Sequence, residues 1–378
     1  MFKKLIVPAL VGLALAPAIA SSATLKELED RINQLEEEAL IATEGVYELS
    51  TNDENRMKIS GYVDTEYHMH TNSKVDRFRL HHMSLFFEKN LGNKWRFFSE
   101  IEYEDGPKLE GDGTVMTDTQ GKIFLESVHM TYAWQQEANI RFGRMFTPAG
   151  IWNVDHYPAF VPTQERPQHI RKMFPQVVDG LQAFGTVSPG KATFVNYDLY
   201  TGNGKGNTGK GDKNQDKALG ARLSVVFPML DHFELGTSYY SDGKDSSKND
   251  EEFAARGLHA KVKAGPVTLQ YEQATGAWDA DERVGHYTQL TYDWDKFTFG
   301  VRNDYYDKDA ADTIDTDSGI PGIQALDKSG ITYNSLFVNY HVNKAVTLKA
   351  EYHAIDYEDN ATKDFGKTIF SVVGYLGN

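Results

Sequence analysis

The chain has 378 residues, of which 12% are aromatic, 32 are glycine and none is cysteine. The formal net charge of −15 argues against a nucleic-acid partner, which requires a basic surface. The lack of cysteine excludes disulfides and thiolate metal sites. Beyond the N-terminal stretch, no apolar run approaches the ~18 residues of a transmembrane helix, so any membrane-spanning part must consist of strands.

The N-terminus has the pattern of an export signal. Two lysines precede an apolar stretch from Leu5 to Ala16, and the small residues Ala18 and Ala20 form a cleavage motif. A retained membrane anchor is the less favoured alternative, because the apolar stretch is short and no basic cluster follows it. We therefore predict that residues 1–23 are a signal peptide.

The next segment, residues 24–42, has the spacing of a coiled-coil helix. Its apolar residues alternate at intervals of three and four, and they are Leu25, Leu28, Ile32, Leu35 and Ala39. Two heptads are too few for a free coiled coil, so we expect a larger oligomeric body to hold this helix. A lone amphipathic helix packed on its own chain is the alternative. Residues 43–56 lack periodicity and are interpreted as a linker.

Residues 57–378 alternate between apolar and polar side chains with a period of two, which predicts two-sided β-strands. The stretch from Trp95 to Glu104, for example, has aromatic and aliphatic residues on one face and charges on the other. A face so strongly charged does not suit a protein core. The polar side chains expected to line a water-filled interior are Lys58, Asp64, Glu66, Arg96, Glu100, Glu102, Glu104 and Arg141.

The connections between these strands alternate in length. Seven short turns alternate with eight longer polar segments, among them residues 149–176 and 276–282, and together they connect sixteen strands. Such asymmetric ends, with aromatic residues at strand ends, are typical of a transmembrane barrel. We predict an all-β fold, a transmembrane antiparallel β-barrel of about 16 strands with an aqueous lumen. A soluble sandwich or propeller also alternates, but its apolar faces would meet in a core.

Strict alternation makes further local predictions. It places the adjacent His81 and His82 on opposite faces, so that they cannot chelate one metal together. It leaves the facing of Arg144 open, because a bulge would reverse it. The glycine-rich stretch 204–209 resembles part of a phosphate-binding loop, but the Ser or Thr and the helix that should follow it are missing from the sequence pattern. The sequence therefore predicts no cofactor, no metal site and no catalytic site.

Several short motifs along the mature chain resemble trimeric Gram-negative outer-membrane porins, nearest the phosphate-selective porin O and P type. These motifs are Ile59-Ser60-Gly61-Tyr62, Phe78-Arg79-Leu80-His81-His82, Phe142-Gly143-Arg144, Pro148-Ala149-Gly150, Asp179-Gly180-Leu181-Gln182 and Tyr197-Asp198-Leu199-Tyr200-Thr201-Gly202-Asn203-Gly204. The resemblance implies a homotrimer with a loop folded into each pore. Phosphate selectivity is not carried over, because the strands here present glutamates where those porins use arginine and lysine ladders.

Residues 149–176 are the candidate for that inward loop. Four prolines and several aromatic residues make this segment stiff, and it lies where the resemblance places a constricting loop. The charged and polar residues expected to set the field at the constriction are Asp155, His156, Glu165, Arg166, His169, Arg171 and Lys172. A surface or subunit-contact loop is the alternative. Glu100, Glu102 and Glu104 are expected to form a cation-attracting track that favours mild cation preference.

These features predict a porin in the outer membrane of a Gram-negative bacterium, which lets small hydrophilic solutes or ions diffuse passively. The expected partners are outer-membrane lipid, lipopolysaccharide and further copies of the chain in a homotrimer, with Leu25, Leu28, Ile32 and Leu35 at the shared axis. The runner-up is a structural or partner-docking barrel, a conduit or adhesin without solute transport. A barrel enzyme is disfavoured, because no nucleophile and base show a meaningful spacing.

Overall fold

The computed structural model describes residues 56–72, 76–104, 121–190, 192–204, 216–243, 253–278, 281–308, 330–358 and 364–377. The side chains of Lys122, Arg171, Lys172, Trp278, Asp281 and Lys308 are not included in this description. The predicted signal peptide, the coiled-coil segment 24–42 and nearly all of the linker 43–56 lie outside the described residues. Those three assignments stay predictions.

The described chain consists of sixteen strands and one helix, α2 (Ile170–Met173). In this part of the chain, no helix has both the length and the apolar character needed to cross a bilayer. The strands are β1 (Lys58–His70), β2 (Arg77–Leu91), β3 (Trp95–Glu104), β4 (Lys122–Gln135), β5 (Ala138–Phe146), β6 (Val177–Gly190), β7 (Thr193–Gly202), β8 (Ala218–Phe227), β9 (His232–Asp242), β10 (Phe253–Ala264), β11 (Val267–Trp278), β12 (Asp281–Trp294), β13 (Phe297–Lys308), β14 (Ile331–Asn343), β15 (Val346–Tyr357) and β16 (Phe365–Tyr375).

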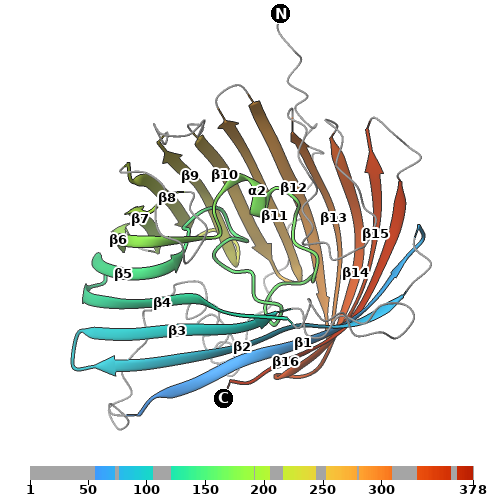
Figure 1. Ribbon diagram of the computed structural model, residues 1–378, viewed down its shortest axis with the longest axis horizontal. Coiled ribbons are helices and arrows are strands. Elements are labelled where there is room, and N and C mark those ends of the chain that lie inside the picture. Colours follow the sequence, from blue (N-terminus) through green and yellow to red (C-terminus); the bar gives the residue numbers. More distant parts are fainter. Residues whose placement is uncertain are drawn as a thin grey trace, which may run out of the picture. The chain divides into compact units, whose positions relative to one another are not determined.

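The strands form one closed antiparallel barrel in which each strand pairs with its neighbours in sequence (Figure 1). Closure is made by β1, which pairs with β2 on one side and with β16 on the other, where Tyr62 lies opposite Tyr375. A closed barrel leaves no unpaired sheet edge, so every strand can satisfy its backbone hydrogen bonds without water. The predicted sixteen-strand antiparallel barrel is confirmed.

The connections have the predicted asymmetry, with one exception. Short turns join β2 to β3, β4 to β5 and the later pairs in the same way, and longer segments lie at the opposite end. The prediction of a long loop over residues 276–282 is wrong. Strands β11 and β12 continue to pair through Gly276, Ala277 and Trp278, so only residues 279 and 280 connect them. The small and polar residues of this stretch belong to the ends of the two strands.

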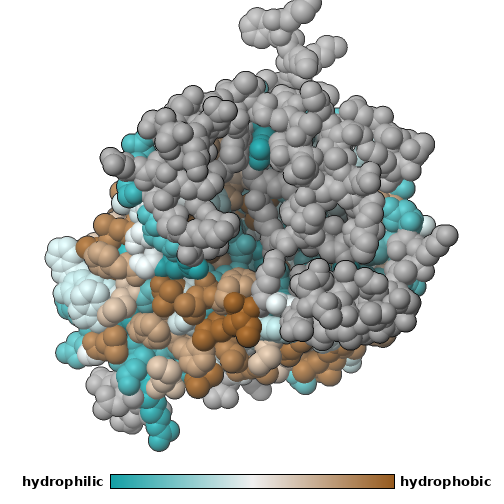
Figure 2. Space-filling view, viewed as in Figure 1, coloured by the Kyte–Doolittle hydropathy of each residue, from teal (hydrophilic) through white to brown (hydrophobic). Residues whose placement is uncertain are grey.

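Apolar side chains lie on the outside of the barrel and polar ones on the inside. Outward residues such as Leu258 and Leu336 are 60% and 61% exposed, whereas the inward Asp64 and Glu100 have no exposed area. Figure 2 shows hydrophobic side chains gathered in a broad patch on the visible outer face. This distribution is the reverse of a water-soluble protein and suits a barrel surrounded by lipid.

Aromatic side chains gather near the short turns on this outer surface. The rings of Trp95 and Tyr132 lie 5.1 Å apart between centroids, and those of Phe297 and Tyr340 lie 5.0 Å apart. Trp294, beside the turn that joins β12 to β13, is 62% exposed. Amphipathic rings at one level of a barrel are typical of the boundary between lipid and water.

Candidate functional site

The inward-facing side chains of the barrel wall are mostly polar and mostly covered. Of the residues predicted to line the pore, Asp64, Glu66, Glu100, Glu102 and Arg141 are buried. Arg96 and Glu104 are half-buried on the same inward faces, and Lys58 is exposed at the start of β1. The alternation of the sequence therefore placed these side chains on the expected face, but most of them do not border open solvent.

What covers them is the connection between β5 and β6, residues 147–176, which we call the inward segment. It crosses the interior of the barrel and includes α2 (Figure 1). Near its start, the backbone N–H groups of Ile151 and Trp152 donate to the Glu272 carboxylate of β11 at 2.9 and 3.1 Å. Arg222 of β8 donates to the carbonyl of Gly150 at 3.0 Å. These bonds join the segment to β8 and β11.

The middle of the inward segment turns toward β3 and β15. The Tyr157 hydroxyl donates to Glu100 of β3 at 3.2 Å, and the Tyr157 ring packs against Tyr62 with centroids 5.8 Å apart. Lys349 of β15 donates to the carbonyls of Pro158 and Val161, each at 2.6 Å. The ammonium thus satisfies two backbone acceptors that would otherwise be buried without a donor.

Residues 163–168 are bound by β13, β15 and β16. Arg302 donates to the Thr163 hydroxyl at 2.6 Å and to the Glu165 carbonyl at 2.8 Å. The Glu351 carboxylate accepts the N–H of Gln164 at 2.6 Å. Lys367 forms an ion pair with the Glu165 side chain.

A common feature of these contacts is that wall side chains bind backbone groups of the inward segment. Carboxylates accept its N–H groups, and basic or amide groups donate to its carbonyls. The wall residues that act in this way are Arg222, Glu272, Arg302, Asp304, Asn339, Lys349 and Glu351. A segment fixed by its backbone on several strands holds one conformation across the interior.

Among the residues predicted to set the field at the constriction, none of the described side chains is fully exposed. His156 and His169 are buried, each 2% exposed, whereas Asp155, Glu165 and Arg166 are half-buried. The predicted residues Arg171 and Lys172 belong to α2, but their side chains lie outside the described residues. The expected cation track is also covered, since Glu100, which accepts from Tyr157, and Glu102, which accepts from Tyr62, are both buried.

Three groups of the inward segment have shifted pKa values. Burial alone would raise the pKa of Glu165, but the charge and hydrogen bond of the Lys367 ammonium, together with nearby His353, outweigh it and lower the pKa to about 2. Burial lowers the pKa of His169 to about 3, and His286 and Arg302 act in the same direction. Burial raises the pKa of Asp155. Glu165 is therefore charged and His169 neutral at physiological pH.

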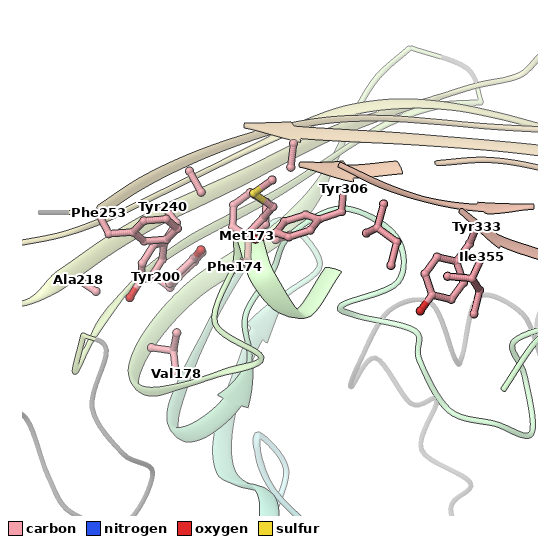
Figure 3. Close-up of a cluster of buried hydrophobic side chains, with 14 of the residues drawn as sticks. Met173, Phe174, Val178, Tyr200, Ala218, Tyr240, Phe253, Tyr306, Tyr333 and Ile355 are labelled. Atoms are coloured by element: carbon pink, nitrogen blue, oxygen red, sulfur yellow. The ribbon is translucent and has the colours of Figure 1, made fainter. Parts of the chain in front are cut away.

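The helix α2 packs into an apolar region that departs from the expected polar lining. Met173 and Phe174 contact a cluster of inward side chains from the long-loop ends of β7 to β16, including Tyr200, Tyr240 and Phe253 (Figure 3). Alternation alone predicted polar side chains on the whole inner face. The inner face becomes apolar where the inward segment supplies a packing partner.

A β-bulge corrects the predicted facing of two histidines. The register of β1 and β2 shifts after Asp64, which pairs with His82 while Thr65 pairs with Leu80. His81 is the extra residue, so His81 and His82 both face inward and both contact the Asp64 carboxylate at 3.0 Å. The prediction that they point to opposite faces is wrong, because strict alternation does not survive a bulge.

Arg144, whose facing the sequence left open, shares the outward parity of Phe142, which is 50% exposed. Its guanidinium donates two hydrogen bonds to Asp179 of β6, at 2.6 and 2.8 Å, and a third to the carbonyl of Leu125. A charged pair on this apolar face is fully hydrogen-bonded in a bidentate arrangement.

Sequence reasoning missed the wall residues that hold the inward segment. Arg302, Lys349 and Glu351 lie on strand faces that the sequence identifies as polar, but nothing in the periodicity distinguishes them from other inward residues. Their role depends on contacts across more than 100 positions of sequence, such as Arg302 with Thr163. Inward parity places them on the correct face, but no local signal in the sequence identifies them as partners of the inward segment.

Comparisons with known proteins agree on the fold. The outer membrane channel DcaP of Acinetobacter baumannii matches with a TM-score of 0.59 and 13% identity over 85% of this chain and 97% of that chain. The anion-selective porin from Comamonas acidovorans matches with a TM-score of 0.59 and 12% identity over 85% and 99%. The chain has the fold of outer-membrane porins.

Three further comparisons concern another solved porin structure, one relative in sequence and the protein-family models. Salmonella typhi OmpF, in complex with daunomycin, has a TM-score of 0.59 and 13% identity over 86% of this chain and 99% of that chain. In sequence, an uncharacterized protein of Aquifex aeolicus (strain VF5) is 23% identical over 360 residues, 82% of this chain and 78% of that protein. No family model matches the chain. At these identities the likeness shows the fold alone.

Proposed function

We propose that the protein is an outer-membrane porin, a passive diffusion channel for small hydrophilic solutes or ions. The observation that carries the proposal is the reversed distribution of side chains, with Leu258 and Leu336 exposed outside and Asp64 and Glu100 buried inside a closed sixteen-strand barrel. The inward segment supports the same function, because a structure fixed across the interior limits what can pass. The fold shared with porins agrees with it.

The proposed location is the outer membrane of a Gram-negative bacterium. A closed barrel with an apolar exterior requires lipid around it, and lipopolysaccharide is the expected partner at the outer leaflet. The export signal predicted for residues 1–23 would bring the chain there. Nothing in this proposal requires an enzyme activity or a cofactor.

The proposed assembly is a homotrimer stabilised by the predicted coiled coil. Leu25, Leu28, Ile32 and Leu35 would pack around the shared axis. Deletion of residues 24–42 should loosen the oligomer without unfolding the barrel, because the barrel closes its own backbone hydrogen bonds. Unchanged heat resistance of the oligomer in gel electrophoresis would contradict a stabilising role.

Conductance of the purified protein in a planar bilayer tests the proposed function. A porin should give stepwise ohmic currents in simple salt, whereas a structural or partner-docking barrel should give none. Because field effects are strong in a narrow, weakly screened passage, replacing Arg171 and Lys172 by alanine should shift the reversal potential toward cations. Alanine at Lys205 and Lys213, between β7 and β8, is the matched control. If the reversal potential does not change in the Arg171/Lys172 variant, α2 does not line the conducting passage.

A further inference from the structure

Three buried carboxylates meet on the wall behind the inward segment. Glu100 and Glu102 lie two residues apart on β3 and face inward. Glu126 joins them because β4 bulges there: Ser127 lies opposite Glu100 and Leu125 opposite the next residue of β3, which leaves Glu126 as the extra residue. The three glutamates are 0%, 2% and 3% exposed, and each offers an oxygen within 4.8 Å of the other two.

The described residues do not balance this charge with lysine or arginine. The Glu100 and Glu126 carboxyl groups are hydrogen-bonded to each other, and the other hydrogen bonds of the three glutamates come from neutral groups, namely the hydroxyls of Tyr62, Ser84 and Tyr157 and the amide of Gln176. The one ion-pair contact is weak, since His156 Nε2 lies 3.7 Å from Glu126 Oε1.

Two carboxylate oxygens in the cluster accept no hydrogen bond from an N–H or hydroxyl group of the described residues. They are Oε1 of Glu100 and Oε2 of Glu126, both fully buried atoms. Burying a carboxylate without a partner costs several kcal/mol. These two oxygens are therefore groups that a bound cation would satisfy.

The spacing and chemistry of these oxygens suit a divalent cation. Calcium binds oxygen ligands at about 2.3–2.6 Å, so two oxygens on one ion lie at most ~5 Å apart. The 4.8 Å limit on the three glutamates is within that span. An all-oxygen set of three carboxylates favours calcium over zinc, which prefers nitrogen and sulfur. We propose that Glu100, Glu102 and Glu126 bind a calcium ion between the barrel wall and the inward segment.

The ion would join the inward segment to the wall. Tyr157 and Gln176 of that segment bind Glu100 and Glu126, so both of these ligands are already in contact with it. A bound cation would fix the two carboxylates and, through them, the middle and the end of the segment. Loss of the ion would leave three buried carboxyl groups crowded together at this contact.

Terbium luminescence gives a direct test, because Tb³⁺ occupies calcium sites and a nearby tyrosine sensitises its emission. The Tyr62 hydroxyl lies 2.8 Å from Glu102 Oε2. We expect sensitised emission from the detergent-solubilised wild-type protein, displaced by Ca²⁺. The double variant Glu100→Gln/Glu126→Gln keeps side-chain size and should weaken Ca²⁺ binding at least tenfold. Glu137→Gln, in the exposed turn between β4 and β5, is the matched control and should bind as the wild type does.

Calorimetry of Ca²⁺ binding and thermal unfolding with and without Ca²⁺ extend the test to the unsubstituted protein. Binding to the folded state alone should raise the unfolding temperature with Ca²⁺ concentration. Absence of Ca²⁺ binding to the wild type, or equal binding by the double variant, would overturn the proposal. Binding of Zn²⁺ but not Ca²⁺ would also overturn it, since the ligands would then include His82, whose Nε2 lies near Glu102 and Glu104. None of these readouts depends on conduction, so the cation site and the proposed channel function can fail separately.

Discussion

Replacing Arg302 by glutamine should release the inward segment from the wall while the barrel stays folded. Arg302 donates to Thr163 and to the Glu165 carbonyl, and its guanidinium lies 5.7 Å from the centre of the Trp152 ring. It also donates to Asp304 on its own strand at 3.2 Å. The substitution therefore removes two bonds to the segment and the cation–π contact, and it leaves the Asp304 carboxylate without its guanidinium.

The expected cost follows from these contacts. Each hydrogen bond from a charged donor contributes about 1.5–3 kcal/mol, and breaking a buried charge pair costs about 3–5 kcal/mol. Because glutamine retains one amide donor and such contributions are not additive, we expect docking of the segment to weaken by roughly 3 kcal/mol, or about a hundredfold. The barrel should be unaffected, since its strands pair through backbone hydrogen bonds.

Limited trypsin digestion measures this release, because Arg171 and Lys172 are cleavage sites inside the segment, whereas Arg166 is followed by Pro167 and is not cut. The variant should be cut between β5 and β6 much faster than the wild type, and its single-channel current should be larger and noisier. Arg256→Gln, an exposed position on β10, is the matched control. Wild-type protease resistance in a folded Arg302→Gln barrel would refute the view that the wall holds the segment through Arg302.

Three further predictions concern the same segment. Gly150 has a φ of 61°, and a Cβ there would lie 1.8 Å from a Glu272 oxygen, so Gly150→Ala should displace the start of the segment and increase tryptic cleavage. The pKa of Glu165 is lowered to about 2, so its carboxylate contributes about 3 kcal/mol to the free energy of docking the segment above pH ~4.3. This contribution is lost as the pH falls toward 2. Glu165→Gln should remove this pH dependence of protease resistance. His169 has its pKa lowered to about 3, so a neutral imidazole is held in the docked segment, and docking should weaken as the pH falls below ~6.5. An unchanged acid limit of protease resistance in His169→Asn would contradict this last prediction.

The strands and their facing could be predicted because they depend on local pattern. The alternation near Glu100 and Glu102 shows that each strand has one polar and one apolar face, as a strand between a polar interior and lipid must have. The number of such strands then predicted a closed barrel. What the pattern could not show were the bulges at His81 and Glu126. A bulge places one extra residue in a strand, and the apolar/polar composition of the strand gives no sign of it. Beyond the bulge, each side chain faces the side opposite to the one that strict alternation predicts.

The wall residues that contact the inward segment could not be predicted from the sequence either. Its prolines and aromatic residues indicate stiffness, and the resemblance to porins placed it inside the barrel. Which wall residues it contacts depends on the register of strands that are distant in sequence, as with Lys349 and Pro158. Charges predicted to face a passage, such as Glu165, are therefore found paired with the wall instead.

The backbone contacts between wall and segment have a consequence for how such a protein can diverge. Glu272 and Lys349 bind N–H and carbonyl groups that every residue type except proline possesses in full, so they recognise the path of the segment and not its side chains. Side chains that project from this path can change without loss of its anchorage. Descendants of one sequence could then acquire different solute preferences by substitution in the segment alone, while a much slower rate of change is imposed on the wall.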